Sequence, residues 1–437
     1  MATSKDSIVA LSSGRLPAGI AVIRISGPKT RFVLETIAGG GIKDRFTTLR
    51  KLMAADGSVI DHGLVVFFPG PSSFTGEDVG EFHVHGSRAV AAKMLETLTG
   101  FAGVRHAEPG EFTRRAFLNG KLDLVETEAL ADLVNAETEA QRRFAVRNAE
   151  GAQSELYSGW RRRLIHARAM IEAEIDFADE EDVPGSVSKT VWTDVAAMAD
   201  EIERHIQGFK AAEIIRDGFE VVILGAPNAG KSSLFNALAQ REAAIVTDEP
   251  GTTRDLLEVV LDLHGMRVRV VDTAGLRDAA GKVETIGIER ARAKAGGADL
   301  VLLLEDMVDP QPVSAVPTGV PLLRIGTKTD LMGARRGAYD LALSSKEGTG
   351  ISELLDEIAG RAAAAVGGAG DILPSRLRHV ELLKEAKYFL SEALSGQSLE
   401  LRAEDLRVAT DRLGRIIGAV DVEDMLDVIF SQFCIGK

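Results

Sequence analysis

Eight residues from Gly225 to Ser232, with the sequence GAPNAGKS, have the types and spacing that bind phosphate. They follow an apolar run and precede a helical pattern, which is the context that a phosphate-binding loop requires. Glycine lets backbone N–H groups approach phosphates, and the N-terminus of the following helix adds a favourable dipole. Lys231 would reach the β- and γ-phosphates, and the Ser232 hydroxyl would bind Mg²⁺. Taken alone, the pattern also fits a glycine-rich turn that binds no ligand.

Three downstream segments indicate that the nucleotide contains guanine. Thr253, in the segment 251–255, can complete the Mg²⁺ shell. Asp272 follows an apolar strand and can hold the metal through water, while the N–H of Gly275 can sense the γ-phosphate. Asp330 follows another strand and can accept hydrogen bonds from guanine N1 and the N2 amine, which favours guanine over adenine.

The base-reading segment departs from the usual pattern at one position. Thr327 stands where Asn is usual, in Thr327-Lys328-Thr329-Asp330. We expect this substitution to loosen the tie between this loop and the phosphate loop, while Asp330 stays in place. The segment 344–346 (Ser-Ser-Lys) is expected to close over the base.

Hydrolysis of the nucleotide needs a group that orients the attacking water. In Ras-like switches a glutamine after Asp-x-x-Gly does this, but here the position holds Leu276, which cannot hydrogen-bond. Glu284 is the candidate replacement; the alternative is an exposed carboxylate that caps a helix. No arginine finger is evident, so the charge that develops on the phosphates needs another cation.

The elements that would position these residues follow three patterns along the chain. Residues 1–118 combine glycine-rich turns with short β-like runs and predict an α+β domain. Long helical patterns occupy 119–217 and return from 371 to 437. Between them, 218–370 alternates apolar strand runs with helices, which predicts a mostly parallel sheet covered on both faces. We therefore expect a P-loop domain inserted into a discontinuous helical domain, because a doubly wound domain can have neighbouring ends.

Composition narrows the class of protein. The 437 residues predict two to three domains, and 45% apolar with 27% charged residues is typical of a soluble globular protein. No apolar run is long enough to span a membrane, no secretion signal is evident, and the single cysteine, Cys434, suits a reducing cytoplasm. The net charge of −14 argues against broad nonspecific nucleic-acid binding, although a local basic patch is compatible with it. A cytoplasmic protein without membrane contact is expected.

Several further segments are distinctive in sequence and are found in all three patterns. They are 19–27, 73–78 (Ser-Phe-Thr-Gly-Glu-Asp), 109–113 (Pro-Gly-Glu-Phe-Thr), 116–124, 286–291 and the terminal 433–437 (Phe-Cys-Ile-Gly-Lys). With them, the chain resembles over its full length the MnmE (TrmE) family of tRNA uridine-modification GTPases.

The resemblance implies an N-terminal tetrahydrofolate-binding and dimerisation domain, a helical domain, and an inserted Ras-like G domain that hydrolyses GTP to GDP. It implies that K⁺ stimulates hydrolysis when two G domains meet, and that this ion takes the place of the arginine finger. Glu284 matches the family's water-orienting glutamate. The implied K⁺ ligands are Asn228, Thr247, Glu249 and Thr252. All expected GTP contacts are Asn228, Ala229, Gly230, Lys231, Ser232, Ser233, Thr247, Asp248, Glu249, Pro250, Gly251, Thr252, Thr253, Asp272, Thr273, Ala274, Gly275, Thr327, Lys328, Asp330, Ser344, Ser345 and Lys346.

The resemblance also implies a folate, either 5,10-methylene- or 5-formyl-tetrahydrofolate. A carboxylate can accept from the pterin ring N–H and amine, while cations suit the glutamate tail. The matching positions are Arg24, Glu81, Lys121 and Lys437. Glu81, His83 and His85 alternate on one strand face, which leaves a metal site as the less favoured alternative, because tetrahedral sites usually draw ligands from several elements.

The family acts with an FAD-dependent partner, MnmG, to install an aminomethyl or carboxymethylaminomethyl group on C5 of the wobble uridine of certain tRNAs. The resemblance therefore implies a homodimer that works with this partner and with tRNA. Cys434 is either a nucleophile in this chemistry or a small apolar residue near a helix end. The basic clusters 142–143 and 161–163 would contact tRNA or form solvated helix faces.

Two other functions stay open from the sequence. One is a ribosome-assembly-type GTPase switch that binds RNA. The other is a folate-dependent aminomethyltransferase in which GTP is only structural. If deletion of the gene removes the wobble-uridine modification, the chain is a tRNA-modification GTPase and not a ribosome-assembly switch. If tRNA modification survives Lys231→Ala, GTP is only structural, as the aminomethyltransferase hypothesis predicts.

Overall fold

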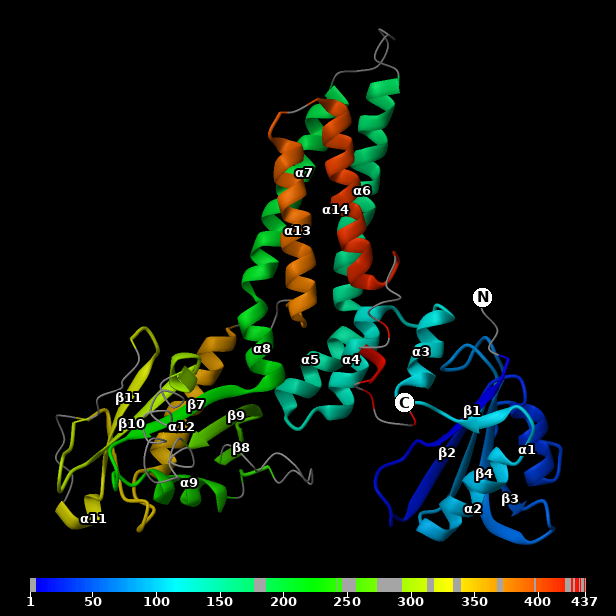
Figure 1. Cartoon of the computed structure of the whole chain (residues 1–437), viewed down its shortest axis with the longest axis horizontal. Coiled ribbons are helices and arrows are strands. Elements are labelled where there is room, and N and C mark those ends of the chain that lie inside the picture. Colours follow the sequence, from blue (N-terminus) through cyan, green and yellow to red (C-terminus); the bar gives the residue numbers. More distant parts are fainter. Residues whose placement is uncertain are drawn as a thin grey trace, which may run out of the picture. The chain divides into compact units, whose positions relative to one another are not determined.

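The protein is described by a computed structural model, which covers residues 5–176, 186–241, 243–245, 257–272, 293–312, 318–332, 339–367, 372–396, 398–420, 426, 429–431, 433 and 436. The chain divides into two compact units (Figure 1). The first comprises 1–131, 154–162 and 410–437, and the second comprises 132–153 and 163–409. Each unit has its own β-sheet.

The sheet of the first unit has the strand order β3-β4-β5-β2-β1-β6. Its strands are β1 (Ser7–Leu11), β2 (Ile20–Ser26), β3 (Thr48–Met53), β4 (Val59–Phe68), β5 (Val79–His85) and β6 (Val104–His106). Alternate residues of these strands, such as Ile23, Ile25 and Phe82, are fully buried in one core with residues of the helices α1 (Thr30–Ala38) and α2 (Arg88–Thr99). The period of two places Arg24 and Glu81 on the opposite face.

The end of the chain packs against the N-terminal domain within this first unit. After β6 follow α3 (Glu111–Leu118) and α4 (Leu124–Asn135). Leu124 shares an apolar cluster with Leu426, Phe430 and Phe433. The carbonyl oxygen of Gly436 accepts a hydrogen bond from the Ser12 hydroxyl at 2.9 Å. Gly436 therefore lies beside the end of β1.

The second unit contains the helices α5 (Glu139–Ala149), α7 (Ser186–Gln207), α8 (Phe209–Asp217) and α13 (Leu377–Leu394). The helices α6 (Ala152–Asp176) and α14 (Leu399–Ile417) belong partly to each unit. The side chains of α7 at Val191, Val195, Met198 and Ile202 repeat with helical spacing and are buried, and α7 packs against α13. Helices from before and after the second sheet are thus neighbours (Figure 1).

The sheet of the second unit has the order β12-β11-β10-β7-β9-β8. Its strands are β7 (Phe219–Gly225), β8 (Leu257–Leu263), β9 (Met266–Asp272), β10 (Leu300–Asp306), β11 (Leu322–Thr327) and β12 (Leu341–Leu343), with helices α9 (Lys231–Ala239), α11 (Thr329–Met332) and α12 (Ile351–Val366). All neighbouring strands are parallel except β8, which pairs antiparallel with β9 at one edge. Successive residues of β7 enter two different cores: Val221 and Ile223 one, Val222 and Leu224 the other.

This architecture confirms the predicted fold class, with an α+β N-terminal domain, a discontinuous helical domain and an inserted P-loop domain. The domain boundaries at 118, 217 and 370 stay predictions. α3 ends at Leu118, α8 ends at Asp217 and α12 ends at Val366. Across the described ranges, every helix is too short or too polar to cross a membrane.

Candidate functional site

The phosphate-binding loop joins the central strand β7 to α9. Gly225 has no room for a side chain, because an added Cβ would lie 2.6 Å from the carbonyl oxygen of Leu304 on β10. Asn228 (φ +63°) and Gly230 (φ +90°) adopt left-handed backbone conformations, and Gly230 caps the N-terminus of α9. The loop therefore turns sharply and directs the first N–H groups of α9 towards the place that a phosphate would take.

Lys231 lies across this loop. Its ammonium group donates to the carbonyl oxygens of Gly225 at 3.0 Å and Ala226 at 2.8 Å, and the side chain is almost entirely buried. A buried ammonium group surrounded by carbonyl dipoles can exchange these partners for an anionic one at little additional desolvation cost. The arrangement is suited to contact with a phosphate oxygen.

Ser232 and Asp272 meet beside the loop. β7 and β9 are parallel neighbours with Ile223 opposite Asp272, so the ends of both strands lie at the same edge of the sheet. The Ser232 hydroxyl donates to Oδ2 of Asp272 at 3.4 Å, and Asp272 is fully buried. A hydroxyl and a carboxylate at this separation are oxygen ligands of the kind that Mg²⁺ prefers, so the two residues fit that ion.

Thr327 links the base-reading loop to the phosphate loop. Its hydroxyl donates to the carbonyl oxygen of Ala229 at 2.9 Å and lies 3.2 Å from that of Glu305. The two loops are therefore joined by a hydrogen bond even with Thr at this position, and whether this tie is looser than one made by Asn stays a prediction. The Thr327 side chain lies beside Gly230, with its β-carbon 3.6 Å from the position that a Cβ on Gly230 would take.

The rest of the base-reading segment is held by side-chain contacts. The Ser344 hydroxyl donates to Oδ1 of Asp330 at 2.8 Å, which brings together two segments predicted to surround the base. Lys328 (φ +66°) donates to Asp306 at 2.6 Å. Partial burial alone would raise the pKa of Asp306, but the hydrogen bond and charge of Lys328 lower it. The hydrogen bond from Ser344 thus fixes the direction of the Asp330 carboxylate.

Several predicted residues lie outside the described part of the chain. They are Glu284, Cys434, Lys437 and the nucleotide residues Thr247, Asp248, Glu249, Pro250, Gly251, Thr252, Thr253, Thr273, Ala274 and Gly275. Their predicted roles stay predictions.

Two of the predicted folate residues contact each other in the N-terminal domain. Arg24 on β2 is opposite Glu81 on β5, and its Nε donates to Oε1 of Glu81 at 3.0 Å. The guanidinium group also lies 5.6 Å from the ring centre of Phe74 and 5.7 Å from that of Phe112, within the range of cation–π attraction. Lys121, the third described folate candidate, contacts a different segment: its Nζ donates to the carbonyl oxygen of Pro71 at 3.1 Å.

The histidines of β5 do not gather with Glu81 into a metal site. His83 Nε2 lies 3.1 Å from Oε2 of Glu81, whereas Nδ1 of His85 contacts Asp61 at 2.9 Å. Among the described residues, no group of three or more His, Cys, Asp or Glu side chains is placed to hold a metal ion. The polar-wall interpretation of Glu81 and His83 therefore fits the geometry better.

An ionic network that the sequence analysis missed supports the 70–78 loop. The guanidinium of Arg115 lies between three carboxylates, at 2.9 Å from Asp6, 3.1 Å from Glu77 and 3.0 Å from Glu111. Burial would raise the pKa of Glu111, but hydrogen bonds from Arg105, from the N–H of Glu108 and from Arg115 lower it. In the sequence, the segments 73–78 and 109–113 are recognisable only as family signatures. That Arg115 joins Glu77 of one to Glu111 of the other depends on the fold.

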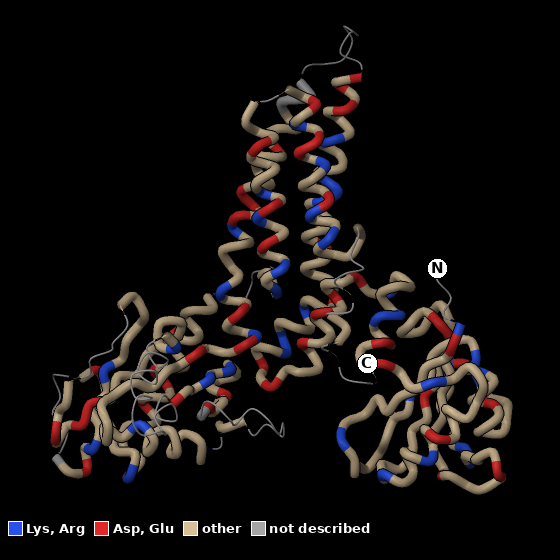
Figure 2. Tube along the Cα trace, viewed as in Figure 1, with Lys and Arg blue, Asp and Glu red and all other residues tan. Residues whose placement is uncertain are grey.

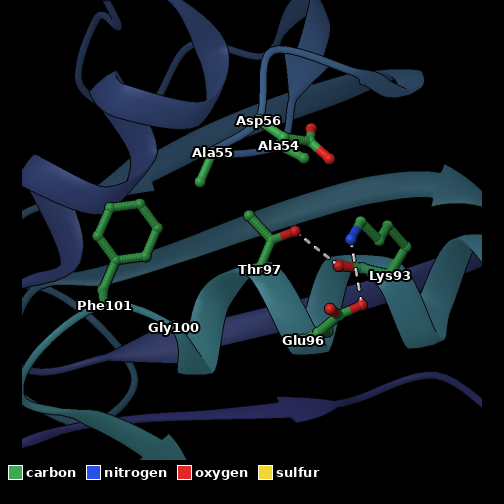
Figure 3. Close-up of a pocket in the computed structure, with 8 residues that line it drawn as sticks. All are labelled: Ala54, Ala55, Asp56, Lys93, Glu96, Thr97, Gly100 and Phe101. Carbon is green, nitrogen blue, oxygen red and sulfur yellow. Dashed lines mark hydrogen bonds and ion pairs between the residues drawn. The ribbon is translucent and has the colours of Figure 1, made fainter.

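A small pocket of about 260 Å³ lies elsewhere in the same domain (Figure 3). Its wall includes Lys93, Glu96, Thr97 and Phe101, and Lys93 is paired with Glu96 at 3.2 Å. None of the described folate candidates, Arg24, Glu81 or Lys121, lines it. This pocket is therefore separate from the predicted folate residues.

Three arginines of the basic clusters on the helices are paired with acids. Arg142 and Arg143 both contact Glu139 at 2.7 Å, and Arg163 binds Asp194 and Glu201. Figure 2 shows basic and acidic positions interspersed along α6, α7, α13 and α14. This pattern is that of solvated helix faces, the alternative to a tRNA contact.

Comparisons with known proteins agree with this architecture. The family model "GTP-binding protein TrmE N-terminus" matches residues 7–121, and "MnmE helical domain" matches 124–434. The tRNA modification GTPase MnmE of Mesorhizobium japonicum is 74% identical over 443 residues, covering 99% of this chain and all of that protein. The protein of the same name from Chelativorans sp. is 57% identical, covering 99% of this chain and 98% of its own.

Among solved structures, the G domain of the T. maritima FeoB iron transporter covers 33% of this chain and 98% of its own, at 28% identity and a TM-score of 0.26. The full-length relatives and the two family models lead to one conclusion: the chain belongs to the MnmE (TrmE) family of GTP-binding proteins.

Proposed function

We propose that this chain is a tRNA modification GTPase, as its relatives are named. The observation that carries the proposal is the convergence of three groups at the carboxyl end of one parallel sheet. Lys231 and Ser232 follow β7, Asp272 ends β9, and Asp330 follows β11. Ser232 and Asp272 contact each other. This edge is where open α/β sheets bind nucleotides, and the groups match phosphate, Mg²⁺ and guanine in turn.

The bound ion would be held by oxygen ligands. Ser232 would bind Mg²⁺ directly, Asp272 would hold it through water, and Thr253 would complete the shell. When bound, Mg²⁺ neutralises charge on the β- and γ-phosphates. Lys231 would add a second positive charge on the same oxygens.

Hydrolysis would use Glu284 to orient the attacking water and K⁺ to supply the missing cation. Asn228 supports the second part, because it is exposed at the tip of the phosphate loop in a left-handed conformation. Its amide oxygen would then bind an ion that two G domains share. Thr247, Glu249 and Thr252 would provide the other ligands.

The N-terminal domain would bind the tetrahydrofolate that supplies the one-carbon unit. Arg24 and Glu81 already form a hydrogen-bonded pair. β1 pairs with β2 so that Leu11 is opposite Ile23, and an added Cβ on Gly436 would lie 2.2 Å from the carbonyl oxygen of Leu11. Lys437 directly follows Gly436 and Cys434 is two residues before it, so we expect both to reach the folate.

The partners would be a second copy of this chain, an FAD-dependent protein of the MnmG type, and tRNA. The product would be an aminomethyl or carboxymethylaminomethyl group on C5 of the wobble uridine. The competing function, a ribosome-assembly switch, would need an RNA-binding surface. The ion-paired clusters at 142–143 and 163 give that function no support among the described residues.

The experiment compares the tRNA nucleosides of cells with and without the gene, and with Lys231→Ala or Lys387→Ala in its place. Lys387 pairs with Glu203 on the helical domain and serves as the matched control. We expect the modified wobble uridine to disappear on deletion and in Lys231→Ala, and to persist in Lys387→Ala. Intact uridine modification with a ribosome-assembly defect would overturn the proposal, and so would full modification in Lys231→Ala.

A further inference from the structure

An ion pair joins the ends of two neighbouring strands beside the base-reading loop. Its acid is Asp306, the last residue of β10, and its base is Lys328, which directly follows β11. The two strands are parallel, with Asp306 opposite Thr327, so the pair lies at the carboxyl edge of the sheet (Figure 1). Asp330, the residue predicted to bind guanine, is only two positions after Lys328.

The carboxylate of Asp306 is fixed at both of its oxygens. Oδ2 accepts a hydrogen bond from the ammonium group of Lys328 at 2.6 Å, and Oδ1 accepts one from the N–H of Val308 at 2.9 Å. The side chain of Asp306 is only 13% exposed. Charge-assisted hydrogen bonds of this length are among the strong ones in proteins. Asp306 can therefore serve as a rigid anchor for the end of the lysine side chain.

The backbone of Lys328 is fixed as well. Its φ of +66° is a conformation that residues with a side chain rarely adopt. Just before it, the carbonyl oxygen of Thr327 accepts from the N–H of Met307 at 3.3 Å, and the Thr327 hydroxyl donates to Ala229. The carbonyl oxygen of Lys328 itself accepts from the N–H of Leu331 at 3.0 Å. Because both ends of the lysine are held, the four-carbon stem between them has little freedom.

The stem is the part of Lys328 that is suited to contact a nucleotide. The ammonium group is already paired with Asp306, and Lys231 supplies the positive charge at the phosphate loop. The side chain of Lys328 is 35% exposed, so its methylene groups are within reach of a ligand. The stems of long cationic side chains pack along apolar surface while their charged ends stay solvated or paired, and the flat face of a purine is such a surface.

We propose that Asp306 is a positioning residue for the guanine base. It anchors the ammonium group of Lys328 so that the lysine stem lies flat against one face of the base, while Asp330 binds the edge. The face and the edge are then held separately, since Asp306 directs Lys328 and Ser344 directs Asp330. This role rests on the nucleotide binding proposed above.

Isothermal titration calorimetry of the full-length chain tests this role with two nucleotides. GDP and inosine diphosphate present the same ring face, but inosine diphosphate lacks the 2-amine that Asp330 is predicted to bind. Asp306→Asn keeps the shape of the anchor and removes its charge. We expect it to weaken both nucleotides by the same factor, roughly three- to tenfold, because both lose the same contact with the stem.

Ser344→Ala provides the contrasting variant. It removes the hydrogen bond of 2.8 Å that directs Asp330, so it should weaken GDP more than inosine diphosphate. Only GDP has the second donor for that carboxylate. A general loosening of the base-reading loop would displace Asp330 too and would follow this pattern. An equal loss for the two nucleotides therefore indicates contact with the face of the base.

Lys328→Met tests the anchor from its other end. Methionine has an unbranched stem and cannot pair with Asp306. We expect the same loss as in Asp306→Asn, and little further loss in the double variant, because two residues that act as a unit are not additive. Asp309→Asn is the matched control. Asp309 is exposed and contacts Gln311 at 2.9 Å, so this variant removes the same charge nearby and should leave affinity unchanged.

Melting temperatures show which variants are folded. The role of Asp306 is overturned if Asp306→Asn binds GDP as tightly as the unaltered chain, if it weakens GDP more than inosine diphosphate, or if its loss adds fully to that of Lys328→Met. If Asp306→Asn does not fold, undiminished binding by Lys328→Met overturns the role alone. In all these cases the unaltered chain still binds GDP and the proposed function stands. Absence of GDP binding by the unaltered chain would refute both.

Discussion

The hydroxyl group of Thr327 joins two loops at a position where asparagine is usual. Its hydrogen bond to Ala229 and its approach to Glu305 hold the end of β11 against the phosphate loop. We expect Thr327→Val, which keeps the shape and removes the hydroxyl, to lower the affinity for GDP by roughly five- to tenfold, since about 1 kcal/mol is lost per buried hydrogen bond. Fluorescence titration with a labelled GDP measures this.

Thr327→Asn and Thr36→Val complete that experiment. The asparagine restores a group that can reach across to the phosphate loop, so affinity should recover most of the loss. Thr36 donates to Phe32 on an exposed helix face and should show no effect. Equal affinity in Thr327→Val and the unaltered chain would mean that the contact does not position the base-reading loop.

Glu284 is the residue on which turnover is predicted to depend. Leu276, directly after 272–275, has no polar group to replace it. We expect Glu284→Ala to bind GTP nearly as well as the unaltered chain but to hydrolyse it at least 100-fold more slowly, a loss typical of a missing general base or water-orienting group. Single-turnover hydrolysis measures the rate, with the exposed Glu96→Ala as the control. Unchanged turnover would remove Glu284 from the mechanism.

At this scale, sequence and structure answer different questions. The identities of Lys231, Ser232, Asp272 and Asp330 could be read directly, because each follows a strand at a fixed spacing. The hydroxyl contact of Thr327 could not, because it depends on the separation between two loops that are 98 residues apart in sequence.

Among the secondary-structure elements, the buried strands of the P-loop domain were the most predictable. The apolar runs at 220–224, 268–271 and 300–304 correspond to β7 (Phe219–Gly225), β9 (Met266–Asp272) and β10 (Leu300–Asp306). Strands covered on both faces consist of continuous apolar runs, so their pattern is strong. β8 was not predicted, since an edge strand has one solvent-facing side and a weaker pattern.

The loop 70–78 depends on α3 through Arg115. This guanidinium is 7% exposed and contacts Asp6, Glu77 and Glu111, and the charges of the last two raise its pKa against the effect of burial. Replacing it by methionine leaves three carboxylates close together without their shared cation. We expect Arg115→Met to reduce the free energy of unfolding by about 3 kcal/mol, as for other broken buried ion pairs.

Thermal unfolding tests the role of Arg115 with Arg88→Met as the control. Arg88 is exposed, and its guanidinium makes one long contact, 3.5 Å to the carbonyl oxygen of Leu16. The same measurement at 1 M salt should reduce the difference little, because buried pairs are poorly screened. A melting temperature for Arg115→Met equal to that of Arg88→Met would show that the network contributes no net stability.

At the scale of the whole chain, residues that precede the inserted sheet in the sequence contact residues that follow it, and these contacts hold the helical domain together. Arg376, just before α13, binds Asp132 through two hydrogen bonds of 2.8 and 2.9 Å, and the Ser375 hydroxyl donates to Gln153 at 3.1 Å. These pairs join residues more than 200 positions apart. The sequence predicts the insertion from the change of pattern, but the closing residues are visible only in the fold.

His205 makes this closure sensitive to acid. Burial lowers its pKa from 6.5 to about 4, a hydrogen bond with the backbone of Ile372 opposes the shift, and His379 nearby lowers the pKa further. His205 takes up a proton more readily in the unfolded chain than in the folded one. The contribution of its neutral, buried ring to the free energy of unfolding is therefore complete above pH 6.5 and is lost as pH falls towards 4. The loss is about 3 kcal/mol, at about 1.4 kcal/mol for each pKa unit.

We therefore expect the melting temperature of the chain to fall between pH 6.5 and 4 more steeply than that of His205→Gln, which cannot take up the proton. His264→Gln is the matched control, because His264 is exposed and paired only loosely with Asp356 at 3.4 Å. The control should follow the pH dependence of the unaltered chain. If His205→Gln follows it as well, protonation of this buried ring does not open the helical domain.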